Sequence, residues 1–207
     1  MAYKYSANQI VLDHGGAGVY DTLGNVITCA PIKVKDVYYL FYASLDAGAL
    51  YTGSLATSKD GIGFTKDPLN PIIPVGAGGS IDEGNAIPIA AIYIDEKKFS
   101  LKNTINNIGL WYVFYNAYTI GGLTTLAWAK GRNANSLQKQ GVIITPPAGF
   151  RFSGILPAHV EYRDSNAFEK ADWELEKAND PVFFIRYNLE EIATGKFDVR
   201  LAIVKLW

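Results

Sequence analysis

The sequence predicts an all-β, β-propeller-like fold of about three four-stranded blade repeats of antiparallel strands. A proline-led apolar run followed by an aromatic strand occurs three times: 30–32 with 38–42, 87–89 with 111–115, and 156–158 with 182–187. A short apolar segment and a glycine-bearing loop precede each of these units. The 13 tyrosines, 10 phenylalanines and 20 glycines favour strands joined by tight turns. A repeat of about sixty to seventy residues built from short strands is typical of propellers.

The chain is interpreted as a single domain, residues 1–207, with repeats at approximately 8–69, 70–140 and 141–207. The expected strands of the three repeats are 27–34, 37–44 and 50–58, then 87–94, 110–117 and 124–130, then 159–163, 181–187 and 199–205. Residues 95–107 and 164–180 resemble insertions between strands. Within the second insertion, residues 168–178 favour a short solvated helix.

Composition excludes several classes of protein. A hydrophobic fraction of 49% with 19% charged residues indicates a packed globular chain. The net charge is −1 and no basic stripe accompanies the aromatics, so nucleic-acid binding is not expected. No apolar stretch approaches about twenty residues, so no membrane span is predicted. Cys29 is the single cysteine and is expected to be a buried small residue.

The first two repeats carry the most specific motifs, at residues 38–42, 54–64 and 67–73. These runs resemble the superfamily of five-bladed β-propeller glycoside hydrolases, which includes arabinanases, xylosidases, invertases and mannoside phosphorylases. The resemblance covers most of repeats one and two and weakens in repeat three. It implies a propeller fold and a sugar-related activity, although a fold does not fix a function.

In that superfamily the catalytic carboxylates lie on the innermost strands, in the patterns Asp-Pro, Asp-Pro and Glu-x-Pro. Residue by residue, the matching positions in this chain are Ala30-Pro31, Ile87-Pro88 and Ile155-Leu156-Pro157. The prolines remain, but all three carboxylates are replaced by apolar side chains. A glycosidase needs two carboxyl groups beside the scissile bond. No catalytic residue is therefore expected at these positions.

The fallback catalytic candidates are Asp82 and Glu83, a few residues before Pro88, together with Asp21 in the first repeat. The phosphorylase branch of the superfamily relies on a single aspartate as proton donor, with phosphate as nucleophile. The competing interpretation is that these are loop carboxylates that cap backbone N–H groups beside a glycine turn. A phosphate site also needs clustered cations, and the arginines near the repeat junctions are scattered.

Four aromatic residues near predicted strand ends are candidate sugar-binding platforms: Tyr20, Trp111, Tyr118 and Trp128. The competing interpretation is packing within or between blades. His14 and His159 are the only histidines and no metal-ligand spacing is present, so neither a metal nor a cofactor is expected.

Three repeats are too few for a five-bladed ring, and an open set of blades leaves apolar faces to be covered. A homo-oligomer, or docking into a larger assembly, is therefore expected. The N-terminus lacks the regions of a secretory signal, and a virion or extracellular location after release is favoured over the cytoplasm. The predicted function is a non-catalytic module for glycan binding or for structural or adhesive assembly, such as a phage virion or tail component. The alternative is an active glycoside hydrolase or phosphorylase acting on a plant or microbial polysaccharide.

Overall fold

The computed structural model describes residues 12–15, 19–95, 109–152, 158–163 and 182–205. Within these ranges the chain forms strands and no helix, so no helix there is long and apolar enough to cross a membrane. The strands are β1 (Gly24–Val26), β2 (Ile32–Val34), β3 (Val37–Leu45), β4 (Tyr51–Ser58), β5 (Thr65–Lys66), β6 (Asn85–Ile94), β7 (Leu110–Tyr118), β8 (Thr124–Asn133), β9 (Ser136–Ile144), β10 (Phe150–Phe152), β11 (His159–Arg163), β12 (Val182–Glu191) and β13 (Phe197–Lys205). The insertions at 95–107 and 164–180 and the helix expected at 168–178 lie almost wholly outside the described residues.

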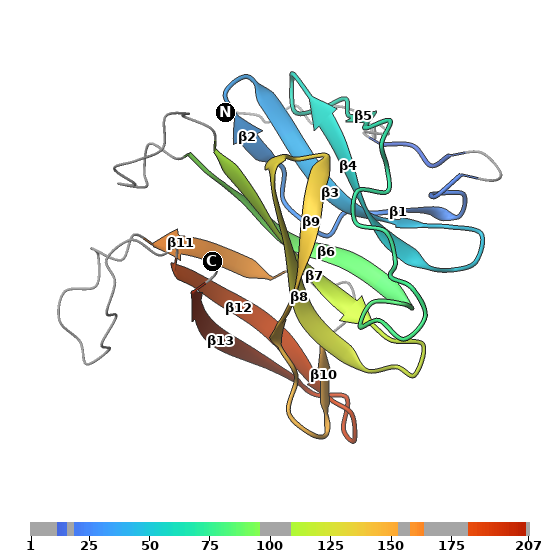
Figure 1. Cartoon of the computed structure of the whole chain (residues 1–207), viewed down its shortest axis with the longest axis vertical. Helices are drawn as coiled ribbons and strands as arrows, with labels where there is room; N and C mark the ends of the chain where they lie inside the picture. The colour runs from blue at the N-terminus through green and yellow to red at the C-terminus, as the bar shows by residue number, and fades with distance from the viewer. Residues whose placement is uncertain (1–11, 16–18, 96–108, 153–157, 164–181, 206–207) are drawn as a thin grey trace, which may run out of the picture.

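The strands form three antiparallel sheets that follow one another along the chain, as Figure 1 shows. The first sheet has the order β1-β3-β4-β5, with β2 also paired to β3. The second has the order β6-β7-β8-β9, and in the third β12 pairs with β10, β11 and β13. Strand β6 contacts β3 and β4 on one side and β11 on the other, so the second sheet lies between the first and the third.

The innermost strand of each sheet is interrupted or irregular, and in the first two sheets this occurs close to a proline. In the first sheet β1 and β2 pair with the same edge of β3, and Pro31 lies in the gap between them. In the second sheet a register shift follows Pro88 within β6. In the third sheet β10 and β11 share one edge of β12. The single strand expected at 27–34 was therefore wrong, since a proline provides no N–H for the ladder.

The short apolar segments that begin repeats two and three in the sequence belong to the outer edges of the previous sheets. Ile73 forms a bridge with Gly53 of β4 and so continues the edge that β5 begins. Residues 142–144, expected in the third repeat, are the end of β9 in the second sheet. The segment expected before the first repeat, residues 9–12, lies outside the described residues except for Leu12.

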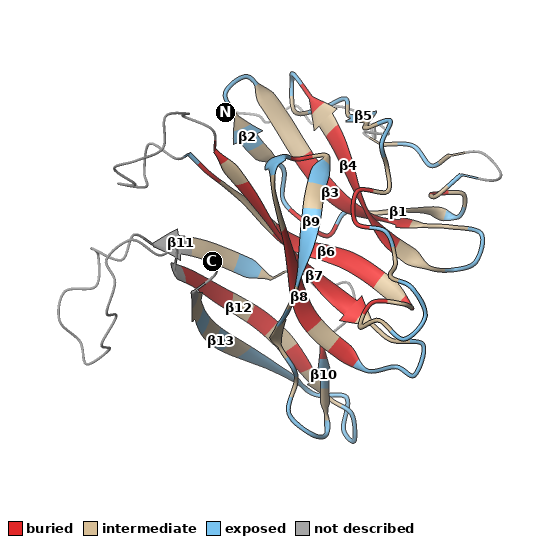
Figure 2. Ribbon diagram, viewed as in Figure 1, coloured by how far each residue is buried: buried red, intermediate tan, exposed pale blue. Residues whose placement is uncertain are grey.

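Alternate residues of β7 pack against different sheets, which explains why this strand is apolar on both faces. Trp111, Val113 and Tyr115 belong to the core shared with the first sheet. Tyr112 and Phe114 belong to the core shared with the third sheet. Figure 2 shows the buried residues concentrated along the central strands of the three sheets. Burial on both faces is the arrangement expected for a strand in a middle blade.

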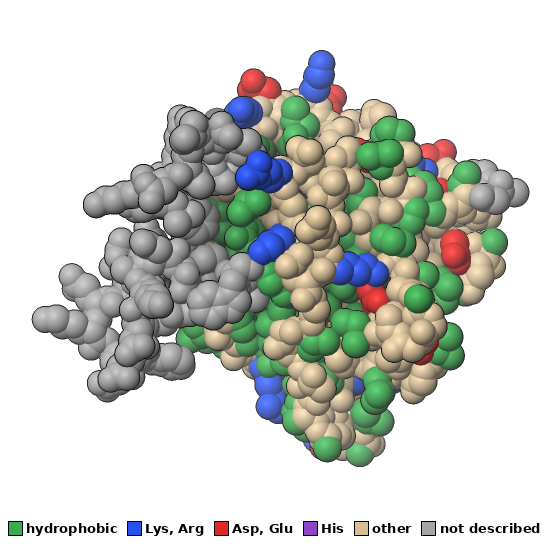
Figure 3. Space-filling view, viewed as in Figure 1, with side chains coloured by type: hydrophobic (Ala, Val, Ile, Leu, Met, Phe, Trp, Pro, Cys, Tyr) green, Lys and Arg blue, Asp and Glu red, His purple; other side chains and the backbone are tan. Residues whose placement is uncertain are grey.

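Hydrophobic side chains also reach the surface in several separate places on the face drawn in Figure 3, among basic and uncharged ones. Some lie on turns, as do Ile120 at 79% exposed and Leu123 at 72%. Isolated exposed apolar residues of this kind are common in folded proteins. A different arrangement is found on β13, where exposed apolar residues occupy alternate positions along a single strand.

Candidate functional site

The innermost strands of all three sheets line a cavity of about 480 Å³, here called the inner cavity. The first sheet contributes residues 27–32, the second contributes residues 89–91, and the third contributes residues 158–160. These are the segments where the innermost strands are interrupted or irregular. The residues at these interruptions, most of which have short side chains, therefore line one common cavity between the three sheets.

The inner cavity is largely apolar. Ala30 and Pro31, which match an Asp-Pro position of the resembling superfamily, line it, and its lining includes no Asp or Glu within the described residues. Ile87 is 2% exposed and belongs to the core. Residues 155–157 lie outside the described residues. At the two matching positions that the structure describes, Ala30 and Ile87, the side chains are apolar, whereas acid–base chemistry needs carboxyl groups there.

Two titratable side chains line the inner cavity, and neither is arranged as a nucleophile. His159 is exposed, and its Nδ1 lies 3.2 Å from Nη1 of Arg186, which also lies 3.5 Å from a carboxylate oxygen of Glu161. Cys29 is 4% exposed. Burial raises the pKa of the Cys29 thiol from 9.0 to about 12, whereas a reactive cysteine needs a lowered pKa.

We expect Cys29 to resist thiol reagents in the folded protein. A pKa of about 12 in place of 9.0 lowers the thiolate fraction at pH 8 by about a thousandfold. Labelling with Ellman's reagent should be slow in buffer and complete in denaturing urea. Because the folded pKa is the higher one, this group stabilises the fold below pH 9.0, and the contribution is lost as pH rises toward 12. Rapid labelling of the native protein would contradict the buried position.

Asp82 is buried at the base of the second sheet and holds an ion pair across it. Its Oδ2 lies 2.5 Å from Nζ of Lys139 in the outer strand β9. It also accepts hydrogen bonds from the hydroxyls of Ser80 at 3.1 Å and Tyr115 at 3.3 Å. Lys139 in turn donates to the carbonyl of Pro74 at 2.5 Å. We call this group the Asp82 cluster; it ties the loop that enters the sheet to the sheet's second and fourth strands.

Asp21 holds the corresponding position in the first sheet. It is 1% exposed and pairs with Lys66, which lies in the outer strand β5 as Lys139 lies in β9. The backbone carbonyl of Asp21 accepts a hydrogen bond from Gly15, and that of Asp82 accepts one from Gly76. A Cβ at either glycine would collide with the carboxylate oxygen of its aspartate. The glycine six residues before each aspartate is therefore required by close approach.

The three fallback candidates thus lie in structural roles in this geometry. Asp21 and Asp82 are buried and paired with different lysines, and Glu83 accepts hydrogen bonds from the backbone N–H groups of Gly79 at 2.5 Å and Ile120 at 3.2 Å. A general acid has to meet its substrate within hydrogen-bond reach. That no catalytic residue is present stays a prediction.

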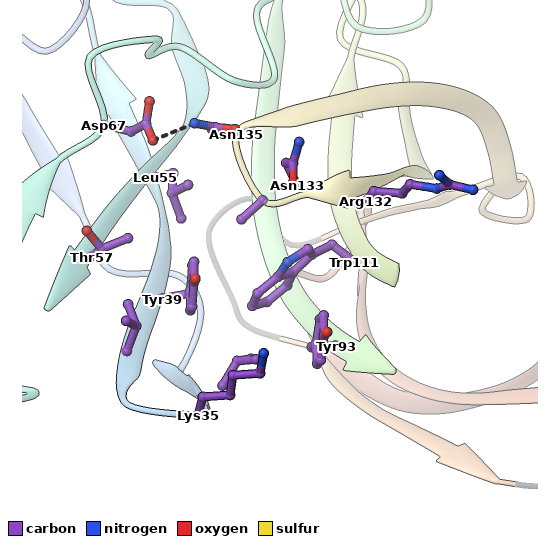
Figure 4. Close-up of a pocket in the computed structure, with 13 residues that line it drawn as sticks. Lys35, Tyr39, Leu55, Thr57, Asp67, Tyr93, Trp111, Arg132, Asn133 and Asn135 are labelled. Carbon is purple, nitrogen blue, oxygen red and sulfur yellow. Dashed lines mark hydrogen bonds between the residues drawn. The ribbon is translucent and has the colours of Figure 1, made fainter. Parts of the chain in front are cut away.

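A second cavity, of about 640 Å³, lies between the first and second sheets at the end where their hairpins turn. We call it the Trp111 cavity (Figure 4). Trp111 forms its base at 3% exposed, with ring centroids of Tyr39 at 4.7 Å and Tyr93 at 5.0 Å. Tyr39 and Tyr93 are half-buried, so the accessible aromatic surface is mainly theirs. One of the four candidate platforms therefore lies in a cavity with two further aromatic rings.

The rim of the Trp111 cavity is polar. Asn135 donates a hydrogen bond of 3.0 Å to Asp67, which joins the second sheet to the first at one end of the cavity. Asn133, exposed at the end of β8, and Thr57 of β4 add an amide and a hydroxyl. Figure 4 shows the side chain of Arg132 directed away from Trp111.

Lys35 closes the opposite end of the cavity from the β2–β3 turn. Val34 pairs with Val37, so Lys35 and Asp36 form a two-residue hairpin turn. Lys35 has a φ of 54°, a left-handed conformation that costs a non-glycine residue roughly 1 kcal/mol. The favoured two-residue hairpin turns require a positive φ at their first central residue, so the turn itself accounts for this conformation.

The other three candidate aromatics do not line this cavity. The hydroxyl of Tyr20 accepts a hydrogen bond of 3.0 Å from Asn70. The Asn70 amide also pairs with both backbone groups of Leu55, at 2.7 and 2.8 Å, and so takes the place of a strand residue. Tyr118 donates to the carbonyl of Phe152 at 3.4 Å. Trp128 is 7% exposed and stacks on Tyr112 at 6.0 Å. The four residues therefore do not form one common platform.

Among the residues the structure describes, no three His, Cys, Asp or Glu side chains gather in a way that suits a metal ion. His14 bonds to its own neighbours, through its backbone N–H to Asp13 and through its ring to the carbonyl of Gly15. His159 lies at the inner cavity beside Arg186. The two histidines are thus engaged in different local contacts, and the expectation of no metal stays a prediction.

Comparison with solved structures addresses the fold. A complex of BT0996 with RGII has a TM-score of 0.52 at 10% identity, and the match covers 95% of this chain and 56% of the BT0996 structure. An N-acetylgalactosamine deacetylase from F. plautii, in complex with blood group B trisaccharide, has a TM-score of 0.51 at 12% identity, with 87% and 51% covered. The fold is propeller-like. The predicted all-β, propeller-like architecture is confirmed, and the resemblance that the sequence suggested holds at the level of the fold.

A β-fructofuranosidase from Aspergillus kawachii complexed with glycerol also matches, with a TM-score of 0.49 at 15% identity and coverage of 93% and 37%. This propeller-like chain spans 36% to 56% of the length of the solved structures it matches. Identities of 10% to 15% show the fold alone. No family model matches the chain. No curated protein matches it either.

Proposed function

We propose that this chain is a non-catalytic, propeller-like module that binds glycan in the Trp111 cavity. The observation that carries the proposal is the composition of that cavity: three aromatic rings at its base and side, with amide, hydroxyl, carboxylate and ammonium groups around its rim. Sugars offer apolar C–H faces that stack on aromatic rings and hydroxyls that hydrogen-bond to such polar groups. The cavity thus presents both kinds of contact that a sugar requires.

The inner cavity supports the non-catalytic part of the proposal. Its described lining carries no carboxylate, and the buried aspartates of the first two sheets are held by lysines. Removing either aspartate from its lysine to serve as an acid would leave a buried charge without its partner. Glycan binding without cleavage is therefore favoured over hydrolysis or phosphorolysis. A role in adhesion or in a virion would use the same binding site and stays a prediction.

The test is a glycan array with the purified protein, followed by calorimetry on the sugars that bind. We expect Asn133→Ala to weaken binding about five- to tenfold, since one hydrogen bond contributes about 1 kcal/mol. Gln138→Ala, an exposed amide on β9 outside the cavity, is the matched control and should bind normally. Asn133 is exposed, so its loss should leave the fold intact.

Mass spectrometry of each bound sugar decides between binding and catalysis. Intact sugar supports the proposal. A cleaved or phosphorolysed product would overturn it and make the chain an enzyme, and loss of product in Asp82→Asn would then identify the acid. No binding on the array, or equal binding by the Asn133→Ala and wild-type proteins, would also contradict the proposed site.

A further inference from the structure

The last strand of the third sheet, β13, carries a row of exposed apolar side chains. Phe197 is 55% exposed, Val199 77%, Leu201 52% and Ile203 39%. They occupy alternate positions and so lie on one face of the strand. The residues between them point to the other face, where Ala202 and Val204 pack against the core that the third sheet shares with the second. Figure 2 shows β13 exposed or partly exposed along its length.

The outer edge of β13 is also unpaired within the described part of the chain. In the first two sheets the third strands, β4 and β8, each pair with an outer strand. Strand β13 holds the same place in the third sheet, and its one described partner is β12. An edge strand exposes backbone N–H and C=O groups that template pairing with another chain, and proteins often protect it with proline, bulges or charged side chains, including inward-pointing ones. Residues 197–205 contain no proline, and every outward side chain from 197 to 203 is apolar.

We propose that β13 pairs with β13 of a second copy of this chain, antiparallel and with the two-fold axis at Val199. This register brings Phe197 opposite Leu201 of the partner subunit and Val199 opposite Val199 of the partner subunit. The sides of the apolar row that face away from β12 are then covered by equivalent side chains. Cross-strand apolar pairs of this kind stabilise a sheet.

Charge favours this register over its neighbour. On the inward face Asp198 and Arg200 lie beside each other, with Arg200 Nη2 at 2.9 Å from an Asp198 carboxylate oxygen. With the axis at Val199, Asp198 lies opposite Arg200 of the partner subunit, and Arg200 opposite Asp198 of the partner subunit. An axis at Arg200 would instead place the two guanidinium groups opposite each other, which is destabilising. The strand is therefore complementary to a second copy of itself.

The first experiment measures mass by light scattering at about 10 and 100 µM. We expect a dimer in the wild type. Val199→Lys places two ammonium groups opposite each other at the axis and should raise the dimer dissociation constant at least about tenfold. Ile120→Lys is the matched control, because it adds the same charge at a residue of similar exposure, 79%, on the β7–β8 turn. It should remain dimeric.

The second experiment tests the register by oxidation. Val199→Cys should form an interchain disulfide because residues at a two-fold axis of paired strands face each other within disulfide range. Leu201→Cys should not, since each Cys would lie opposite residue 197 of the partner subunit. The native Cys29 is 4% exposed and does not compete. A monomeric wild type, a dimer that survives Val199→Lys, or cross-linking of both cysteine variants or of neither would each overturn the proposal.

Discussion

Replacing Trp111 with alanine is expected to lower the free energy of unfolding by about 3–5 kcal/mol. The indole is 3% exposed and contacts rings from two sheets: Phe41 of β3 at 5.4 Å and Tyr39 at 4.7 Å, and Tyr93 of β6 at 5.0 Å. Its removal would leave a cavity at the junction of the first and second sheets that rigid strands fill poorly. Urea unfolding followed by circular dichroism measures the loss.

Two variants sharpen the result. Trp111→Phe keeps a ring at the same place and should cost clearly less than Trp111→Ala. Ile120→Ala removes an apolar side chain that is 79% exposed and should change stability by no more than about 0.5 kcal/mol. A loss below about 1 kcal/mol in Trp111→Ala would show that the indole does not join the two sheets.

Trp111 belongs both to the core and to the lining of the Trp111 cavity, and this affects how its role in binding can be tested. A sugar-binding assay on Trp111→Ala would report the loss of the junction as well as the loss of a ring, so binding is better tested at the exposed Asn133. The sequence offered two interpretations of the aromatic residues, platform or packing. The structure places Trp111 in both settings at once, as core and as cavity base.

The fold was predictable because each repeat has the same pattern, a proline-led apolar run followed by an aromatic strand. A continuous apolar run, as in 111–115, predicts a strand that is buried on both faces, and a middle sheet packed between two others requires this. Pro88 lies within the innermost strand of the second sheet, as expected, whereas Pro31 lies between β1 and β2. Periodicity could not show that the strand is interrupted around Pro31. The residues from 27 to 32 are short or apolar, a pattern that predicts one continuous strand.

The Trp111 cavity was only partly predictable. Trp111 was a candidate because it lies near a predicted strand end. Tyr39 and Tyr93 each lie within an apolar, strand-forming run, which suggests packing alone. Asp67 and Asn135 meet only because two sheets pack, 68 residues apart in the chain. The one local signal was the Asn-Ala-Asn sequence at 133–135, which predicts a turn; the structure has a two-residue turn at 134–135.

The ion pairs of Asp21 and Asp82 also depend on residues that are distant in the sequence. Of the two interpretations of Asp21 and Asp82, one was a loop carboxylate beside a glycine turn. Their lysines were not foreseen, since Lys66 follows Asp21 by 45 residues and Lys139 follows Asp82 by 57. A comparison of the outer strands of the two repeats would have revealed them, because each lysine lies on the outermost strand of its own sheet.

Lys139→Met is the second change with a large expected effect: it should destabilise the fold by about 2–4 kcal/mol. Asp82 is 3% exposed, and without Lys139 its charge keeps only the hydroxyls of Ser80 and Tyr115. Burial and the nearby Asp82 raise the pKa of Tyr115, so this phenol stays a donor across the neutral range. That raised pKa stabilises the fold below the unfolded pKa of tyrosine, and the contribution is lost as pH rises above about 10. Urea unfolding at pH 7 measures the effect of the lysine, and Lys59→Met, on an exposed turn, is the control.

The double variant Asp82→Asn with Lys139→Met separates a structural pair from a functional carboxylate. If the ion pair secures the loop that enters the second sheet, the double variant should lose less stability than the sum of the single variants, with a coupling of at least about 1 kcal/mol. Lys66→Met should reproduce the effect in the first sheet, because Asp21 is buried in the same way. Active sites commonly sacrifice stability, so a catalytic Asp82 would leave Asp82→Asn as stable as the wild type or more so. A destabilised Asp82→Asn with strong coupling to Lys139 would instead show that the aspartate is retained for the fold, as its burial predicts.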